Sequence, residues 1–73
     1  MSQKAIVIYP NPAKESIHVE GLEHACQGQI YNSLGALVKV VNINGDEAIG
    51  INDLASGLYL LRCGNLSVRF IKK

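Results

Sequence analysis

The sequence predicts an all-β fold, a small sandwich or barrel of about seven short strands. Apolar and polar residues alternate with a period of two in several segments, whereas the period of a helix is poorly developed throughout. Turn-forming residues recur about every eight to twelve positions, which is the spacing of strand connections in all-β domains. The chain has 73 residues, enough for one domain, and its core should be aliphatic because it has only three tyrosines and one phenylalanine.

The individual strands follow from this alternation and from the turns that interrupt it. We expect the domain to cover residues 5–73, with residues 1–4 as a leader or linker remnant. The expected strands are Ala5–Tyr9, Ser16–Glu20, Gly28–Asn32, Leu37–Ile43, Ala48–Ile51, Leu58–Cys63 and Leu66–Lys72.

Three of the connections are predicted to be tight hairpin turns. Asn44–Gly45 offers two residues that tolerate positive φ, which suits a primed turn between the fourth and fifth strands. Gly64–Asn65 places glycine first, as a type II′ turn requires, between the last two strands. Leu34–Gly35 joins the third and fourth strands, with Gly35 available for a left-handed or bulged position.

The segment Pro10–Asn11–Pro12 ends the first strand abruptly. Proline has no N–H and a fixed φ, so it stops strand pairing. Asn11 is expected to bond its own backbone in a turn. We interpret the segment as a corner at which the chain crosses to the other sheet.

The stretch LASGLYLLRC is the most informative local pattern. A tyrosine at such a β-sandwich corner returns its hydroxyl to a backbone group a few residues upstream, so we expect a structural role for Tyr59. The period of two places Tyr59, Leu61 and Cys63 on one face and Arg62 towards water. The chain has no tryptophan, and Cys63 follows Tyr59 by four residues rather than two, which argues against an antibody-type domain pinned by a disulfide.

Two cysteines, Cys26 and Cys63, permit one disulfide, which would stabilise the fold by about 3 to 4 kcal/mol. The sequence favours the alternative, two small half-buried thiols packed as hydrophobic residues. His18 is expected on the exposed face of its strand and His24 in a loop. These histidines and cysteines lack the paired spacing of zinc ligands, so we expect no metal.

Composition and motifs argue against several classes of function. Seven basic and six acidic side chains give a net charge of +1, too small to attract nucleic acid or an anionic membrane. The apolar runs are too short for insertion into a membrane. No nucleophile elbow and no phosphate-binding glycine loop occurs, so we expect no catalytic residue and no cofactor. Asp46, Glu47 and Asp53 are interpreted as solvated turn residues.

Four segments in order, YPNPAKESIHVEG, IYNSLGALVKVV, INDLASGLYLLRC and VRFIKK, resemble the C-terminal sorting domain of type IX secretion cargo proteins from Bacteroidetes. The resemblance covers about residues 8–73. It implies an immunoglobulin-like β-sandwich of about seven antiparallel strands that acts as a non-catalytic address label on a larger secreted precursor.

The same resemblance implies the partners and the route. A separate signal peptide takes the precursor to the periplasm, where outer-membrane translocon and shuttle proteins read the domain. In many cargoes a sortase-like cysteine peptidase then removes the domain and joins the cargo to lipopolysaccharide at the cell surface. The absence of a signal peptide from these residues is expected if they are only the tail of a longer protein.

The resemblance also carries roles to particular residues. Pro10, Asn11 and Pro12 form the first corner, and Gly35 is the hairpin glycine. The targeting residues lie in the last two strands: Gly57, Tyr59, Phe70, Ile71, Lys72 and Lys73. Gly28 and Cys63 depart from the family pattern, because an apolar residue and a β-branched residue are more usual at these positions.

Two alternatives stay open at this point. The L-x-x-G-x-Y pattern also resembles the corner of fibronectin-like or immunoglobulin-like adhesion or carbohydrate-binding modules, which are commonly followed by more chain. Lys72 and Lys73 could also serve only to keep an edge strand soluble. The sequence further leaves open a weak homodimer through an open sheet edge.

Overall fold

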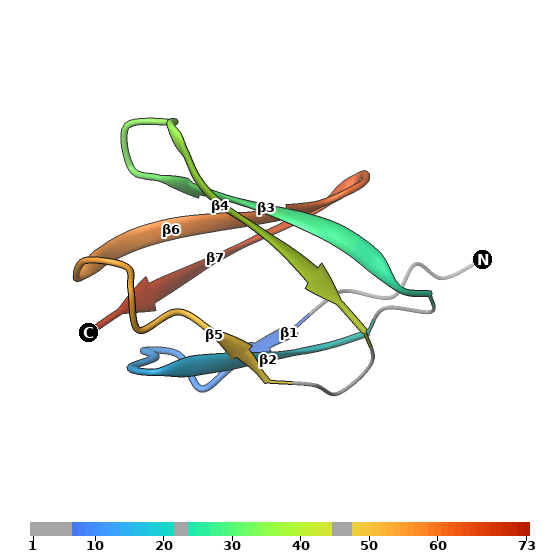
Figure 1. Ribbon diagram of the computed structural model, residues 1–73, viewed down its shortest axis with the longest axis horizontal. Helices are drawn as coiled ribbons and strands as arrows, with labels where there is room; N and C mark the ends of the chain where they lie inside the picture. The colour runs from blue at the N-terminus through green and yellow to red at the C-terminus, as the bar shows by residue number, and fades with distance from the viewer. Residues whose placement is uncertain (1–6, 22–23, 45–47) are drawn as a thin grey trace.

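Seven strands in two antiparallel sheets make up the computed structural model, which describes residues 7–21, 24–44 and 48–73 (Figure 1). The three-stranded sheet has the order β1–β2–β5, formed by β1 (Val7–Tyr9), β2 (Ser16–Glu20) and β5 (Ile49–Gly50). The four-stranded sheet has the order β4–β3–β6–β7, formed by β4 (Leu37–Ile43), β3 (Cys26–Asn32), β6 (Gly57–Cys63) and β7 (Leu66–Lys72). The two sheets form two layers, so the prediction of an all-β sandwich is confirmed.

None of the residues in these ranges is helical, so none belongs to a helix that could cross a bilayer. Three predicted strands, Ser16–Glu20, Leu37–Ile43 and Leu66–Lys72, have the predicted bounds. The third begins two residues earlier, at Cys26, because Cys26 still pairs with Ile43. The predicted start of the first strand and the leader 1–4 lie outside the described residues.

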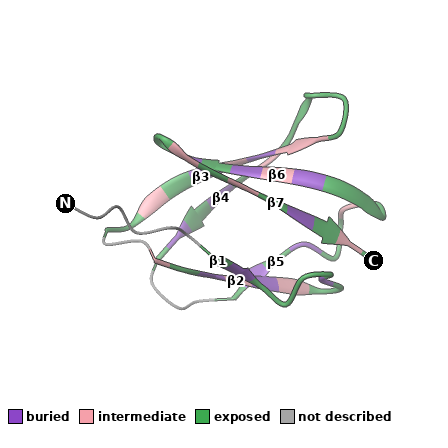
Figure 2. Cartoon of the chain, turned by 180° about the vertical axis from the view of Figure 1, so that it is seen from behind, coloured by how far each residue is buried: buried purple, intermediate pink, exposed green. Residues whose placement is uncertain are grey.

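Alternating side chains from both sheets fill the space between the layers, as Figure 2 shows by the purple segments along the strands. In β2 the buried residues are Ile17 and Val19, and in β6 they are Tyr59, Leu61 and Cys63, so the predicted period of two is confirmed. The largest fully buried side chains are Phe70, Ile17, Ile30, Ile43, Ile51 and Leu61. As expected, this core is mainly aliphatic.

Gly28 is buried in the middle of β3, and neighbouring side chains occupy the space that its own side chain would take. A Cβ atom at this position would lie 2.8 Å from Cδ1 of Ile43 and 2.9 Å from Cδ1 of Leu61. The glycine that departs from the usual apolar residue is therefore compensated by larger side chains on the two flanking strands.

Two of the three predicted hairpins are confirmed. The Gly64–Asn65 turn joins β6 to β7, which stay in register from Cys63 opposite Leu66 to Gly57 opposite Lys72. The Leu34–Gly35 turn joins β3 to β4, and a bulge shifts the register between Ile30 and Tyr31.

The predicted Asn44–Gly45 hairpin is wrong. Gly45 lies outside the described residues, but the strands on either side of it belong to different sheets. β5 pairs with β2, where Ile49 lies opposite Ile17, and both side chains are buried. Burial of these isoleucines between the layers therefore outweighs the local preference of Asn-Gly for a two-residue hairpin.

The two cysteines form a disulfide between β3 and β6, with 6.3 Å between the Cα atoms. The interpretation of two separate thiols is therefore wrong. In the register of β3 and β6, Cys63 lies opposite Gly28, and Cys26 is two residues further along β3 on the same face.

Candidate recognition site

The site is built first on the corner that precedes β6. The hydroxyl of Tyr59 donates a hydrogen bond to the backbone carbonyl of Ala55 at 2.6 Å, as predicted. Gly57 has a φ of +156°, a conformation that side chains disfavour, and this lets the chain turn from the loop into the strand. The corner fixes the start of β6 and, through pairing, the end of β7.

Tyr59 and Phe70 lie opposite one another on β6 and β7 and stack with their ring centroids 5.7 Å apart. Tyr59 is 7% exposed and Phe70 is fully buried, so neither ring presents a surface to a partner. They act as the packed support beneath the end of β7. Buried rings cannot contact a partner directly. A targeting role for Tyr59 and Phe70 stays a prediction.

The proline segment and Ala13 form hydrogen bonds with the free edge of β7, near its carboxyl end. The side-chain oxygen of Asn11 accepts a hydrogen bond from the N–H of Ile71 at 3.0 Å. Ala13 then donates its N–H to the carbonyl of Ile71 and accepts a bond from the N–H of Lys73, both at 2.7 Å. We call this set of three hydrogen bonds the terminal clamp.

The terminal clamp corrects one expectation and adds a residue that the sequence analysis missed. Asn11 was expected to bond its own backbone, but it bonds a strand 60 positions away. Ala13 is fully buried and forms a parallel bridge with Lys72. The sequence signal that could have indicated this contact is the small size of the residue after Pro12, because Ala13 is fully buried against β7. The Tyr9–Pro10 and Asn11–Pro12 bonds are both cis.

Three residues at the end of β7 present different groups to solvent. The side chain of Ile71 is 46% exposed and lies opposite Leu58. The half-buried Lys72 lies opposite Gly57, and its ammonium group donates a hydrogen bond to the carbonyl of Lys73. Lys73 is exposed and carries the most accessible charge of the three.

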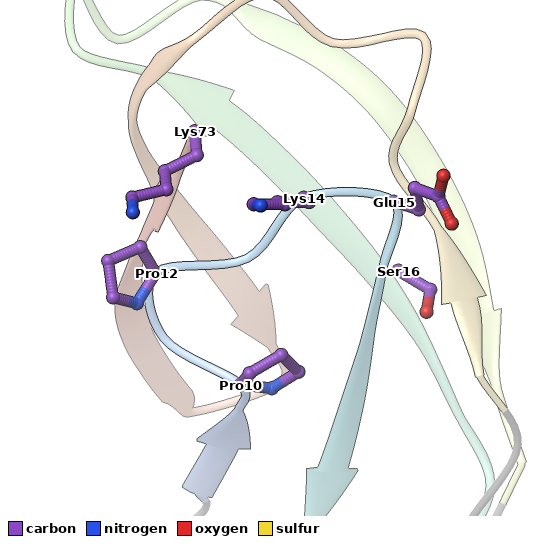
Figure 3. Close-up of a pocket in the computed structure, with 6 residues that line it drawn as sticks. All are labelled: Pro10, Pro12, Lys14, Glu15, Ser16 and Lys73. Carbon is purple, nitrogen blue, oxygen red and sulfur yellow. The ribbon is translucent and has the colours of Figure 1, made fainter.

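An open groove of about 540 Å³ runs beside this strand end (Figure 3). Its residues come from the proline segment, the start of β2 and the last residue of the chain: Pro10, Pro12, Lys14, Glu15, Ser16 and Lys73. In Figure 3 the side chain of Lys73 lies beside the ring of Pro12. The groove is open to solvent, so it suits contact with a protein surface better than enclosure of a small molecule.

Gly35 lies in the turn between β3 and β4. This turn follows Asn32, which lies opposite Tyr59, so it is at the same end of the strands as the tyrosine corner but nearer the β4 edge of the sheet than the β7 edge. Its φ is +86°, and the side-chain oxygen of Asn32 accepts hydrogen bonds from the N–H groups of Leu34 and Ala36 at 2.9 and 3.0 Å. The N-x-x-G segment is thus a self-contained turn.

Electrostatic interactions elsewhere are modest. Lys39 on β4 pairs with Asp53 at 3.0 Å, and this hydrogen bond lowers the pKa of Asp53 below its ordinary value. His18 stacks on Tyr9 across β1 and β2, and His24 is exposed in the loop before β3. Across residues 7–21, 24–44 and 48–73, no three His, Cys, Asp or Glu side chains gather closely enough to hold a metal ion.

Comparison with known proteins identifies one family. A family model described as secretion system C-terminal sorting domain matches residues 7–73. This range contains both the terminal clamp and the tyrosine corner. Searches of curated proteins and of solved structures each found no match.

Proposed function

Because this chain belongs to the secretion system C-terminal sorting domain family, we propose that the translocation machinery reads it at the end of β7. The family consists of sorting signals for type IX secretion. The domain therefore interacts with that machinery, and the protein that carries it is exported to the cell surface or the extracellular space.

The terminal clamp is the observation that carries the proposal. It fixes the backbone of Ile71 and Lys73 against the proline segment, and β6 pairs with Ile71 on the other side through Leu58. A preorganised surface loses less conformational entropy when a partner binds it. The proline motif and the motif at the end of β7 are joined by these hydrogen bonds. We therefore propose that both motifs serve the same recognition site.

The residues predicted for targeting divide into two groups by exposure. Gly57, Ile71, Lys72 and Lys73 are proposed to contact the partner, because each is at least partly exposed. The buried Tyr59 and Phe70 are proposed to hold those residues in place, together with the exposed segment Pro10–Pro12, whose Asn11 accepts a hydrogen bond from Ile71. Gly35 is proposed to act only in folding.

The proposed partners are the outer-membrane translocon and its shuttle proteins. The two lysines at the end of β7 favour a partner surface that carries carboxylates, because complementary charge speeds encounter and fixes orientation. We propose no catalytic role for the domain. Family membership favours this sorting role over an adhesion or carbohydrate-binding module.

We further propose the route that the family resemblance implies. The precursor passes through the periplasm, and a sortase-like cysteine peptidase then removes residues 5–73 and attaches the cargo to lipopolysaccharide. Residues 1–4 would be a linker remnant that precedes the domain. Mass spectrometry of the released domain would test this route, since its first residue marks the cleavage site.

The test of the main proposal is export of a reporter that carries this domain in a host with type IX secretion. Removal of residues 71–73, or Gly57→Ala combined with Tyr59→Ala, is expected to leave the reporter in the periplasm. Lys73→Glu is expected to reduce export, whereas Lys73→Arg, which keeps the charge, is the matched control and should be exported like the parent. Full export of a folded truncated domain would refute the proposal.

A further inference from the structure

The four-stranded sheet has one face packed on the core and one face turned to solvent, and the solvent face is unusually apolar. We define the outer face by its apolar side chains Tyr31, Leu37, Val40, Leu58, Leu60 and Ile71, together with Arg62 and Arg69. Four of these apolar residues, Leu37, Val40, Leu58 and Ile71, are 44 to 52% exposed. Contiguous exposed apolar surface of this kind marks protein interaction sites.

The strand register places these side chains side by side. Leu37, Tyr31 and Leu60 lie opposite one another on β4, β3 and β6, and Arg69 on β7 ends the row. Leu58 and Ile71 form the next row on β6 and β7. A third row contains Val40 on β4, Gln29 on β3 and Arg62 on β6, because Gln29 lies opposite both of the others. Directly opposed residues share one face of a sheet, so the patch is continuous across all four strands.

The charges on the outer face have one sign. Arg62 lies opposite Ser67, so Arg69 is its diagonal neighbour on β7, and the two positive charges share one face of the sheet. The described carboxylates lie elsewhere: Glu15 and Glu20 flank or belong to β2, and Asp53 pairs with Lys39. Lys39 lies opposite the buried Ile30 and therefore on the inner face.

We propose that the outer face docks onto a component of the secretion machinery whose surface has an apolar centre and carboxylates at the positions of Arg62 and Arg69. This inference rests on the proposed function and names the chemistry of the partner. The outer face is distinct from the groove beside Lys73, because the two have no residue in common.

The charges also argue against a second copy of the chain as the occupant. A symmetric face-to-face pair would bring four arginines together with none of the described carboxylates to offset them. Pairing through the sheet edges is opposed as well. The β4 edge has a bulge and an inward-pointing Lys39, and the terminal clamp occupies the end of β7.

The test compares matched substitutions on the two sheets of the reporter fusion. Val40→Thr and Val7→Thr are the same change at residues that are 50% and 52% exposed, but only Val40 lies on the outer face. Arg62→Glu with Arg69→Glu reverses the charge, and the double lysine variant preserves it. Urea unfolding of each purified variant checks that the sandwich is intact.

We expect the double glutamate variant to be exported about tenfold more slowly than the parent, since opposed like charges weaken binding strongly. Val40→Thr should slow export to a smaller extent, and Val7→Thr and the double lysine variant should match the parent. A photo-crosslinking residue at position 40 should crosslink to a protein of the machinery through a peptide rich in Asp and Glu, and one at position 7 should not.

The outcomes separate this inference from the proposed function. If the parent fusion is not exported, the proposed function fails and the inference fails with it. If the parent is exported and the folded double glutamate variant keeps pace with it, only the inference is overturned. The inference would also be overturned if position 40 crosslinked only to a second copy of this chain and sedimentation showed a dimer.

Discussion

The side-chain oxygen of Asn11 and the backbone N–H of Ile71 are joined at 3.0 Å although 60 positions separate them in the sequence. Asn11→Ala leaves this N–H to water and weakens the terminal clamp. We expect a loss of about 1 kcal/mol in the free energy of unfolding, measured by urea titration. Asn42→Ala, an exposed asparagine on β4, is the control and should change stability little. Equal losses of stability for the two substitutions would mean that the hydrogen bond of Asn11 adds nothing to the free energy of unfolding.

The tyrosine corner can be tested by removing only the hydroxyl oxygen of Tyr59. Tyr59→Phe keeps the buried ring and its stacking on Phe70 but removes the hydrogen bond to Ala55. We expect destabilisation of about 1 kcal/mol by urea unfolding, since a part-buried hydrogen bond is lost. Tyr31→Phe, on the outer face, is the control. An unchanged midpoint for Tyr59→Phe would show that the ring alone sets the corner.

A methyl group should have different effects at two strand glycines. Gly28→Ala forces a Cβ atom against Ile43 and Leu61, and we expect a loss of about 1 to 3 kcal/mol. Gly50→Ala meets nothing within 4 Å, and we expect it to be neutral or slightly stabilising. Thermal unfolding of both variants tests this. Relief of the Gly28→Ala defect by Ile43→Val would identify the clash directly.

The disulfide gives a prediction about reducing conditions. Cys26 and Cys63 close a loop of 37 positions, so its reduction should lower the free energy of unfolding by about 3 to 4 kcal/mol. Unfolding with and without a phosphine reductant measures the difference, and the double serine variant should not respond to reductant. Two free thiols by alkylation and mass spectrometry of the unreduced protein would contradict the bridge.

The pair of Lys39 and Asp53 gives a prediction about acid. The hydrogen bond from Lys39 lowers the pKa of Asp53 in the folded state, so folding favours the ionised carboxylate. The stabilisation is therefore present above the ordinary pKa of 3.8 and is lost as the pH falls through the lower, folded value. Urea midpoints of the parent and Asp53→Asn should differ slightly near neutral pH and converge in acid. A gap that widens in acid would reverse the assigned sign.

Much of the fold could be predicted because it depends on local chemistry. The alternation of Ile17, Val19, Leu61 and Cys63 identifies buried faces, and the glycines at 35 and 64 identify two hairpins. The hydroxyl of Tyr59 could also be placed, since its acceptor is only four residues away. In each case the information lies within a few residues of the feature.

The errors concern contacts between residues far apart in the sequence. The Asn44–Gly45 turn is locally favourable, but pairing of β5 with β2 decides the connection. The partner of Asn11 and the bond between the cysteines depend on how the strands are ordered within the sheets. For the candidate site, the sequence predicted the end of β7, and burial in the structure separates Tyr59 and Phe70 from the accessible Ile71 and Lys73.

The bridge between Ala13 and Lys72 has a consequence for how the protein folds during synthesis. The proline segment is translated 60 positions before Ile71, and its hydrogen bonds to β7 form only after that strand has been made. Contacts that are so distant along the chain make folding slow, in milliseconds to seconds for β-sandwiches. Until then the N–H and carbonyl of Ala13 lack these partners, so a nascent chain stalled before residue 72 is expected to bind chaperones or be degraded.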